Sequence, residues 1–275
     1  MSDDAAPPSA AFVRVETIDP GYHQVTFDNP PLNLYDPEVE TRLAKIVERL
    51  TADPTVKVVV FDSAHPDFFI AHHNLARVDE FGAGMPTWFT LIHRLSNARF
   101  ITVGSLRGRA RGIGSEFLLA LDVRFASQEK AILAQLEVGT GIIPGCGGLQ
   151  RLWQLTGRSR ALEIIALSED YDAETAERYG WVNRAVPDAE LDAVVDRFAR
   201  RVASFDHAAL QAVKETLNQE APSPNASTLL ATNERFAELL ARDHVQDRLR
   251  LLAQSDPATL YDLELNMGDT LGPRT

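Results

Sequence analysis

The sequence predicts an α/β protein whose strands, loops and helices alternate up to about residue 187 and give way to an all-helical region. Two kinds of pattern lead to this class. Short β-branched runs such as Val56–Phe61 are typical of buried strands, while apolar residues at helical spacing recur between them. With 275 residues, 45% of them hydrophobic, the chain can bury a large core without disulfides or metal.

The first elements are a hairpin, a helix and a buried strand. Apolar and polar residues alternate over 12–18 and 24–27 on either side of Pro20-Gly21, which predicts an antiparallel hairpin. The prolines in residues 29–34 predict a loop. Val39, Leu43, Ile46, Val47 and Leu50 then lie on one face of a predicted helix, which begins at Asp36-Pro37 and ends at Asp53-Pro54.

The middle of the chain repeats a strand, loop and helix order. Residues 64–75 read as a loop, 87–95 as a helix and 100–103 as a strand. A glycine-rich turn over 107–114 leads into a helical run at 115–121 and a strand at 122–126. A second glycine-rich loop covers 137–148, and a helix opens at 149–152.

The last third of the sequence has a helical pattern. Leu191, Val194, Val195, Phe198 and Val202 share one face, and amphipathic segments follow at 207–219 and 228–252. We therefore divide the chain into a disordered lead-in at 1–11, an α/β core at 12–204 and a helical C-terminal region at 205–275.

Composition excludes several classes of protein. The single cysteine, Cys146, rules out an intrachain disulfide and a cysteine-rich zinc site. A net charge of -12 argues against binding to nucleic acid or to an anionic membrane. The sequence has no apolar run long enough for a transmembrane helix and no signal-peptide pattern, so we expect a cytoplasmic protein.

Two glutamates stand beside the glycine-rich loops. A loop that runs into a helix start gathers unpartnered backbone N–H groups, so the glycines at 108–114 form either a tight turn or a place for a phosphate or an oxyanion. Glu116 follows at the predicted helix start, and Glu137 follows the apolar run 132–136. Either acid alone could be structural, but two such buried acids suggest a pair for proton transfer.

Several ordered segments resemble the enoyl-CoA hydratase/isomerase (crotonase) family. Residues 107–122, 135–139 and 143–152 are similar to its signature loops, and the stretches 29–34 and 167–187 resemble segments before and after them. The likeness covers about residues 12–220. It implies a crotonase-like spiral of β-β-α turns with a helical C-terminal region that trimerises, giving a homotrimer or a dimer of trimers.

The resemblance also implies a chemistry. Two backbone N–H groups, which fall on Ala71 and Ile113, would stabilise the enolate of an acyl-CoA thioester. Glu116 would activate water for attack on the β carbon, and Glu137 would deliver a proton to the α carbon. Keeping both acids favours hydration of a 2-enoyl-CoA, with no cofactor or metal beyond the coenzyme A of the substrate. The substrate-binding residues would be Leu34, Ile70, His72, His73, Asn74, Leu75, Arg111, Gly112, Gly114, Pro144 and Gly145.

The sequence departs from the family pattern at three places. His72 and Asn74 stand where the first loop usually has glycine and aspartate, Ile113 replaces a usual glycine, and Arg77 stands near the position of a phosphate-binding lysine. These changes favour an unusual acyl group or another crotonase reaction, such as isomerisation, decarboxylation or carbon–carbon hydrolysis. A non-catalytic module that binds CoA esters is a third reading.

Two groups of charged or titratable residues, a histidine pair and three arginines, each allow a structural or a functional role. His72 and His73 are either a structural pair or pocket histidines; neighbouring residues in extended backbone point opposite ways, which disfavours a metal site. Arg107, Arg109 and Arg111 form either salt bridges or contacts with CoA phosphates or an acidic acyl group, with Arg111 the preferred candidate for ligand contact.

Overall fold

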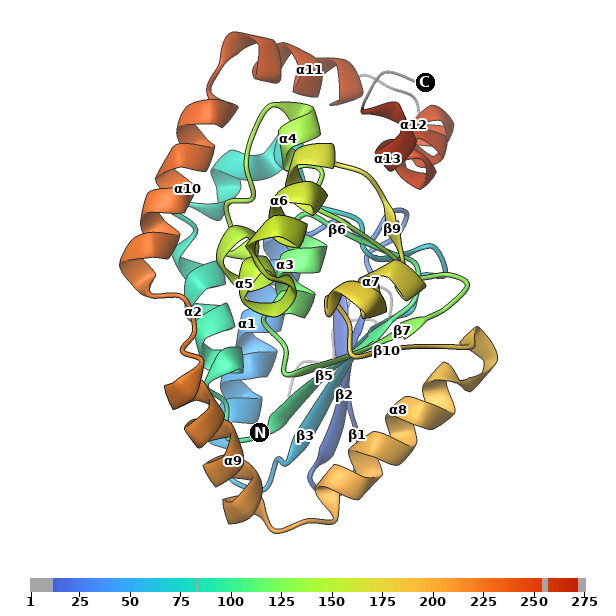
Figure 1. Cartoon of the computed structure of the whole chain (residues 1–275), viewed down its shortest axis with the longest axis vertical. Coiled ribbons are helices and arrows are strands. Elements are labelled where there is room, and N and C mark those ends of the chain that lie inside the picture. The colour runs from blue at the N-terminus through green and yellow to red at the C-terminus, as the bar shows by residue number, and fades with distance from the viewer. Residues whose placement is uncertain (1–11, 83, 254–256, 272–275) are drawn as a thin grey trace, which may run out of the picture.

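The computed structural model describes residues 12–82, 84–253 and 257–271, so the predicted lead-in at 1–11 lies outside the described residues. Its centre is a six-stranded sheet in the order β1-β2-β3-β5-β7-β10 (Figure 1). β1 and β2 form the predicted antiparallel hairpin, and the remaining pairs are parallel. The strands are β1 Val13–Asp19, β2 Tyr22–Phe27, β3 Val58–Ser63, β5 Ile101–Leu106, β7 Val123–Ser127 and β10 Arg184–Val186.

A second, smaller sheet was not predicted. It has the order β4-β6-β8-β9 and consists of β4 Phe68–Ile70, β6 Arg109–Arg111, β8 Ile132–Ala134 and β9 Tyr171–Asp172. β4 and β6 fall in stretches that the sequence analysis assigned to a loop and a turn. Two or three residues carry no detectable periodicity, so only pairing with distant segments makes them strands.

The two sheets arise from a repeated β-β-α unit. A long strand of the first sheet is followed by a short strand of the second and then by a helix, as in β3, β4 and α2 (Pro86–Ser96) and again in β5, β6 and α3 (Ile113–Leu119). The α/β spiral expected from the sequence is therefore confirmed. Each unit ends its short strand in a loop at one side of the molecule, and these loops form the pocket described below.

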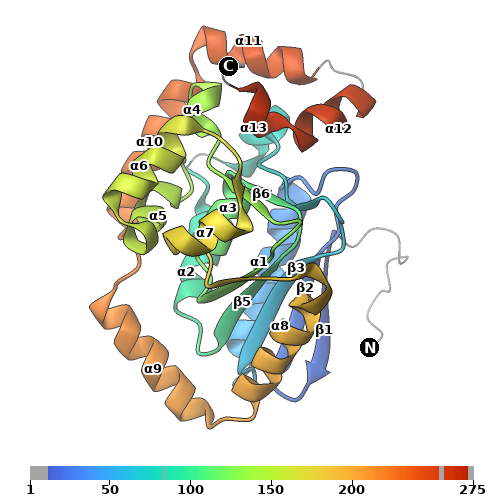
Figure 2. The same cartoon turned by 45° about the vertical axis from the view of Figure 1, so that its right-hand side comes forward.

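Both faces of the large sheet are covered, which explains the continuous apolar run in β3. Val59 and Phe61 face a core shared with α1 (Pro37–Ala52), while Val58 and Val60 face α8 (Asp188–Ala203). Figure 2 shows α8 lying against the strands on the side away from α1. The other helices of the body are η1 Leu75–Phe81, α4 Glu137–Thr140, α5 Gly148–Thr156, α6 Arg158–Leu167 and α7 Ala173–Tyr179.

The regular elements described after residue 205 are all helices. α9 (His207–Glu220) matches the predicted segment, whereas the single amphipathic segment predicted at 228–252 is two helices, α10 (Ala226–Leu240) and α11 (Asp243–Ala253). α12 (Pro257–Leu265) and α13 (Met267–Thr270) lie at the end of the molecule near α11, opposite α9 (Figures 1 and 2). Within the described residues, no helix combines the length and apolar character needed to cross a membrane.

Candidate active site

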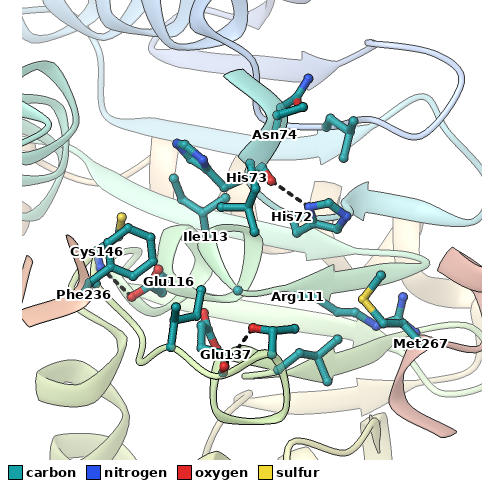
Figure 3. A pocket seen from close by; sticks show the side chains of 18 of the residues that line it. His72, His73, Asn74, Arg111, Ile113, Glu116, Glu137, Cys146, Phe236 and Met267 are labelled. Carbon is teal, nitrogen blue, oxygen red and sulfur yellow. Dashed lines mark hydrogen bonds between the residues drawn. The ribbon is translucent and has the colours of Figure 1, made fainter. Parts of the chain in front are cut away.

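One pocket brings together the loops that end the short strands, the start of α3, and side chains from α10, α12 and α13 (Figure 3). Most of its wall is apolar, and a few polar groups converge on it, as in a typical small-molecule site. It is lined by Leu32, Leu34, His72, His73, Asn74, Leu75, Ala76, Met85, Arg111, Gly112, Ile113, Glu116, Leu136, Glu137, Thr140, Ile142, Gly145, Cys146, Phe236, Leu260, Glu264 and Met267.

Glu116 projects from α3 into this pocket and is only 2% exposed. Its Oε1 accepts hydrogen bonds from the backbone N–H of Cys146 at 2.9 Å and of Gly148 at 2.7 Å. Burial raises the pKa of Glu116 to about 7, against the lowering effect of these two bonds. A Cβ at position 148 would lie 2.9 Å from Oε1, so the glycine lets the loop close around the carboxylate.

Glu137 begins α4 and reaches the same pocket from the opposite loop (Figure 3). Burial, and then the negative charge of Glu116, raise the pKa of Glu137 well above its ordinary value. An ideal Cβ on Gly112 would lie 3.1 Å from its Oε1, so Glu137 sits directly over the turn before α3. The two acids predicted as a pair are therefore together, and their mutual repulsion favours one ionised and one protonated carboxyl.

Ile113, predicted to offer a backbone donor, lines the pocket. Ile113 is the first residue of α3, and its N–H has no hydrogen-bond partner among the described residues. The preceding amide, that of Gly112, donates to the carbonyl oxygen of Ala134 at 3.1 Å. This bond holds the turn against β8 and leaves the Ile113 N–H available to a ligand.

The prediction for Ala71 needs correction. Its N–H donates to the carbonyl oxygen of Asn33 at 3.2 Å, and its side chain packs in an apolar cluster outside the pocket lining. Two residues later, the N–H of His73 has no partner within the described part of the chain, and His73 lines the pocket. The amide that the first loop offers to a ligand is therefore that of His73.

His72 and His73 point in different directions, as expected for adjacent extended residues. The ring of His73 packs on Phe81, with 4.1 Å between centroids, and against Tyr35. His72 instead lies between the His73 carbonyl oxygen, 2.7 Å from its Nδ1, and Glu264 Oε1, 2.8 Å from its Nε2. The structure shows no set of three or more metal-ligating side chains in the residues it describes.

Arg107 and Arg111 form salt bridges, and Arg109 donates a hydrogen bond to the backbone. Arg111 is fully buried and its guanidinium donates to both carboxylate oxygens of Asp170, at 2.8 and 2.5 Å. Arg107 pairs with Asp188 and Asp192, and Arg109 Nε donates to a backbone oxygen of α12. Arg111 lines the pocket with its charge paired to Asp170, and its contact with a CoA phosphate or an acidic acyl group stays a prediction.

Three further predicted binding residues do not line the pocket: Ile70, Gly114 and Pro144. Gly114 has a packing role instead, because a Cβ there would lie 2.3 Å from the carbonyl oxygen of Ile70. This close approach presses α3 onto β4 and so sets the spacing of the two loops. The predicted residues that do line the pocket are Leu34, His72, His73, Asn74, Leu75, Arg111, Gly112, Ile113, Glu116, Glu137 and Gly145.

Sequence reasoning missed the contribution of the C-terminal helices. Phe236 of α10, Leu260 and Glu264 of α12, and Met267 of α13 all line the pocket. Phe236 needs a glycine at position 145, since a Cβ there would lie 2.7 Å from the Phe236 ring. No local pattern indicated that Glu264 would meet His72.

A two-sheet spiral of β-β-α units has a pocket that joins the carboxyls of Glu116 and Glu137 with two main-chain amides that have no partner in the described residues. This arrangement defines a crotonase-type enzyme. The model of the enoyl-CoA hydratase/isomerase family matches residues 17–254. The chain therefore belongs to this family.

Solved structures and related sequences agree with this assignment. The chain is 43% identical to an enoyl-CoA hydratase-type protein from Streptomyces avermitilis, with a TM-score of 0.88 over 98% of this chain and 99% of that one. An enoyl-CoA hydratase from Mycobacterium avium subsp. paratuberculosis is 26% identical, with a TM-score of 0.80 over 90% and 100%. The short-chain-enoyl-CoA hydratase of Clostridium acetobutylicum is 26% identical over 231 residues, covering 82% of this chain and 88% of the relative.

Proposed function

We propose that this enzyme hydrates a 2-enoyl-CoA thioester. The observation that carries the proposal is the pairing of Glu116 and Glu137 in one pocket, with the pKa of Glu116 raised to about 7 and that of Glu137 raised well above its ordinary value. Groups that exchange protons with water and carbon near neutral pH need such values. The activities for which relatives are named, among them the crotonyl-CoA hydratase of Syntrophomonas wolfei at 29% identity over 205 residues, support the same reaction.

The reaction adds the elements of water across the conjugated double bond. Ionised Glu116 takes a proton from a water molecule, whose oxygen bonds to the β carbon. The π electrons move toward the carbonyl and place negative charge on the thioester oxygen. Protonated Glu137 then gives its proton to the α carbon, and a proton passes back from Glu116 to Glu137 to complete the cycle.

The N–H groups of His73 and Ile113 would hold the thioester oxygen. Both are fixed by their loops before the substrate arrives, so they stabilise the developing charge without reorganising. Each such donor contributes about 3–4 kcal/mol to the transition state. We infer no cofactor other than the coenzyme A carried by the substrate.

The proposal is tested with Glu116→Gln and Glu137→Gln. Each variant keeps the shape of the side chain and removes its proton transfer, so the rate of 2-enoyl-CoA hydration should fall by about 10²- to 10⁴-fold. Glu190→Gln, an exposed position on α8, serves as the matched control and should keep wild-type activity. Loss of the conjugated thioester absorbance gives the rate. Failure of the wild-type enzyme to hydrate any ester in a panel of chain lengths would falsify the proposal.

A second reaction of the same family is favoured by one observation. His72, where family members usually have glycine, lies in the pocket and carries a partner carboxylate, Glu264. A 3-enoyl-CoA or a β-keto acyl-CoA consumed much faster than any 2-enoyl ester would favour isomerisation, decarboxylation or carbon–carbon cleavage. Tight ester binding without turnover across the panel would instead indicate a binding module.

We propose a trimer or a dimer of trimers as the working assembly. Large apolar side chains on α9 are exposed in the single chain, with Val213 at 60% and Leu217 at 62%, which supports burial of this helix against another copy. Light scattering at micromolar concentration should give a multiple of the 30.3 kDa chain mass. A monomer mass would contradict this assembly. The cytoplasmic location expected from the sequence stays a prediction.

A further inference from the structure

Glu264 occupies an unusual position in the pocket wall. It comes from α12, lies 192 positions along the chain from His72, and is 2% exposed. Its Oε1 is 2.8 Å from His72 Nε2, and its backbone oxygen accepts a hydrogen bond from Arg111. A carboxyl group buried to this degree needs partners for both of its oxygens.

The contacts around His72 make Glu264 a carboxylate. The carbonyl oxygen of His73 can only accept, so His72 Nδ1 carries a proton and donates it. The Arg111 guanidinium, which also binds Asp170, is close enough to favour negative charge on Glu264. Burial raises the pKa of Glu264, but the charge and hydrogen bond of His72 outweigh burial and hold the pKa below its ordinary value. His72 and Glu264 therefore form an ion pair.

The second oxygen of Glu264 is unsatisfied. Oε2 is buried and has no hydrogen-bond partner among residues 12–82, 84–253 and 257–271. Leu260, one turn before Glu264 on α12, and Met267, at the start of α13, line the pocket with apolar side chains. A charged acceptor without a donor in such a wall is costly unless a ligand supplies the donor.

The pair lies away from Glu116 but close to Glu137, since an ideal Cβ on Gly112 would lie 4.0 Å from His72 Cβ and 3.1 Å from Glu137 Oε1. Figure 3 shows His72 and Met267 on one side of the pocket and Glu116, Cys146 and Phe236 on the other. Glu264, held 2.8 Å from His72, therefore reaches the ligand from the side opposite Glu116. This argues for a role in specificity rather than in the chemical step.

We propose that Glu264 is a specificity-determining residue whose Oε2 accepts a hydrogen bond from an O–H or N–H donor of the bound acyl-CoA. The inference rests on the proposed function, since it takes the ligand to be an acyl-CoA. The donor has two possible sources, a hydroxyl or amine on the acyl group or an amide N–H of the pantetheine arm. A ligand without a donor at this place leaves a buried charge unsatisfied and binds more weakly.

The test measures binding of saturated esters, which cannot be hydrated, so the result is independent of turnover. Calorimetry with butyryl-CoA and 4-hydroxybutyryl-CoA, and with hexanoyl-CoA and 6-hydroxyhexanoyl-CoA, compares the wild type with Glu264→Gln and Glu264→Leu. Loss of a hydrogen bond to a charged group should weaken binding about 10- to 100-fold. If only the hydroxy esters bind more weakly to the variants, the donor lies on the acyl group. If all esters bind more weakly by the same factor, the donor lies on the pantetheine arm.

Two control variants isolate this role. Asp262→Asn removes an exposed charge from the same helix, and Tyr261→Phe removes the 2.6 Å hydrogen bond that ties α12 to Asp67 without changing the pocket lining. Both should bind every ester as the wild type does. Unchanged affinity in Glu264→Gln, or the same weakening in Tyr261→Phe, overturns the proposal. Thermal melting confirms that each variant is folded, and if the leucine variant is not, the glutamine variant decides.

Discussion

The Nε2 atom of His72 lies 2.8 Å from the Oε1 atom of Glu264, which joins the loop after β4 to the C-terminal helix α12 in the wall of the pocket. Burial lowers the pKa of His72, but Glu264 outweighs burial and raises the pKa above its ordinary value. The pKa of Glu264 is lowered in turn. The two opposite shifts mean that folding favours the charged form of both partners.

We expect the pair to stabilise the fold in a defined pH window. His72 contributes fully below its unfolded pKa of 6.5 and loses this contribution as pH rises through its higher folded value. Glu264 contributes above 4.5 and loses it as pH falls through its lower folded value. A double-mutant cycle with His72→Asn and Glu264→Gln, followed by urea unfolding, should therefore show its largest coupling, about 0.5–3 kcal/mol, between pH 4.5 and 6.5. Equal coupling at pH 9 would contradict this account.

The two pocket acids predict a bell-shaped pH profile for hydration. Glu116 must be ionised to accept a proton from water, so kcat/KM should rise as pH increases through about 7. Glu137 must be protonated to donate to the α carbon, and its raised pKa means that activity falls again only at higher pH. Because the two carboxyls interact, the two pKa values that bound the profile describe the pair and not either residue alone. Initial rates from pH 5 to 10 test this, and a flat profile across pH 7 would rule out Glu116 as the base.

Removing one backbone donor should impair catalysis and spare the fold. Ile113 is the first residue of α3, where proline is tolerated because the N–H has no intrahelical partner. Ile113→Pro deletes that N–H, so kcat should fall about 10²- to 10³-fold. Ile113→Ala removes the same side chain, keeps the N–H and should retain most activity. Circular dichroism checks folding, and equal rates in the two variants would argue against a role for this amide.

Glu40 should weaken the fold as pH rises. It is buried in α1, its Oε1 has no partner in the described part of the molecule, and burial raises its pKa to about 7. Folding therefore favours the protonated form, and stability present below the unfolded pKa of 4.5 is lost as pH rises toward 7.

Glu40→Gln removes this loss. Relative to the wild type, the variant should gain on the order of 1–3 kcal/mol at pH 8, after allowance for solvent screening, and little at pH 4. Urea unfolding at both values gives the free energies. Glu48→Gln, an exposed position on the same helix, should show no such pH-dependent gain. A constant difference between Glu40→Gln and the wild type at both pH values would contradict this prediction.

Much of the framework was predictable because local sequence determines it. The hairpin β1–β2, the strand β3 and the helix α1 follow from alternation, β-branched runs and helical spacing, which act over a few neighbouring residues. The pairing of Glu116 with Glu137 followed from their similar settings and from the family resemblance. These features depend on residue type and spacing, and both can be read directly from the chain.

Other features were decided by contacts between distant residues. The loop at Asn33 accepts a hydrogen bond from the Ala71 N–H, and this leaves the His73 N–H as the amide available to a ligand. Arg111 pairs with Asp170, which the fold brings beside it. Glu264 reached the pocket only when α12 folded over it. Hydrogen-bond direction and charge neutralisation are properties of partners brought together by the fold, so spacing along the sequence carries no record of them.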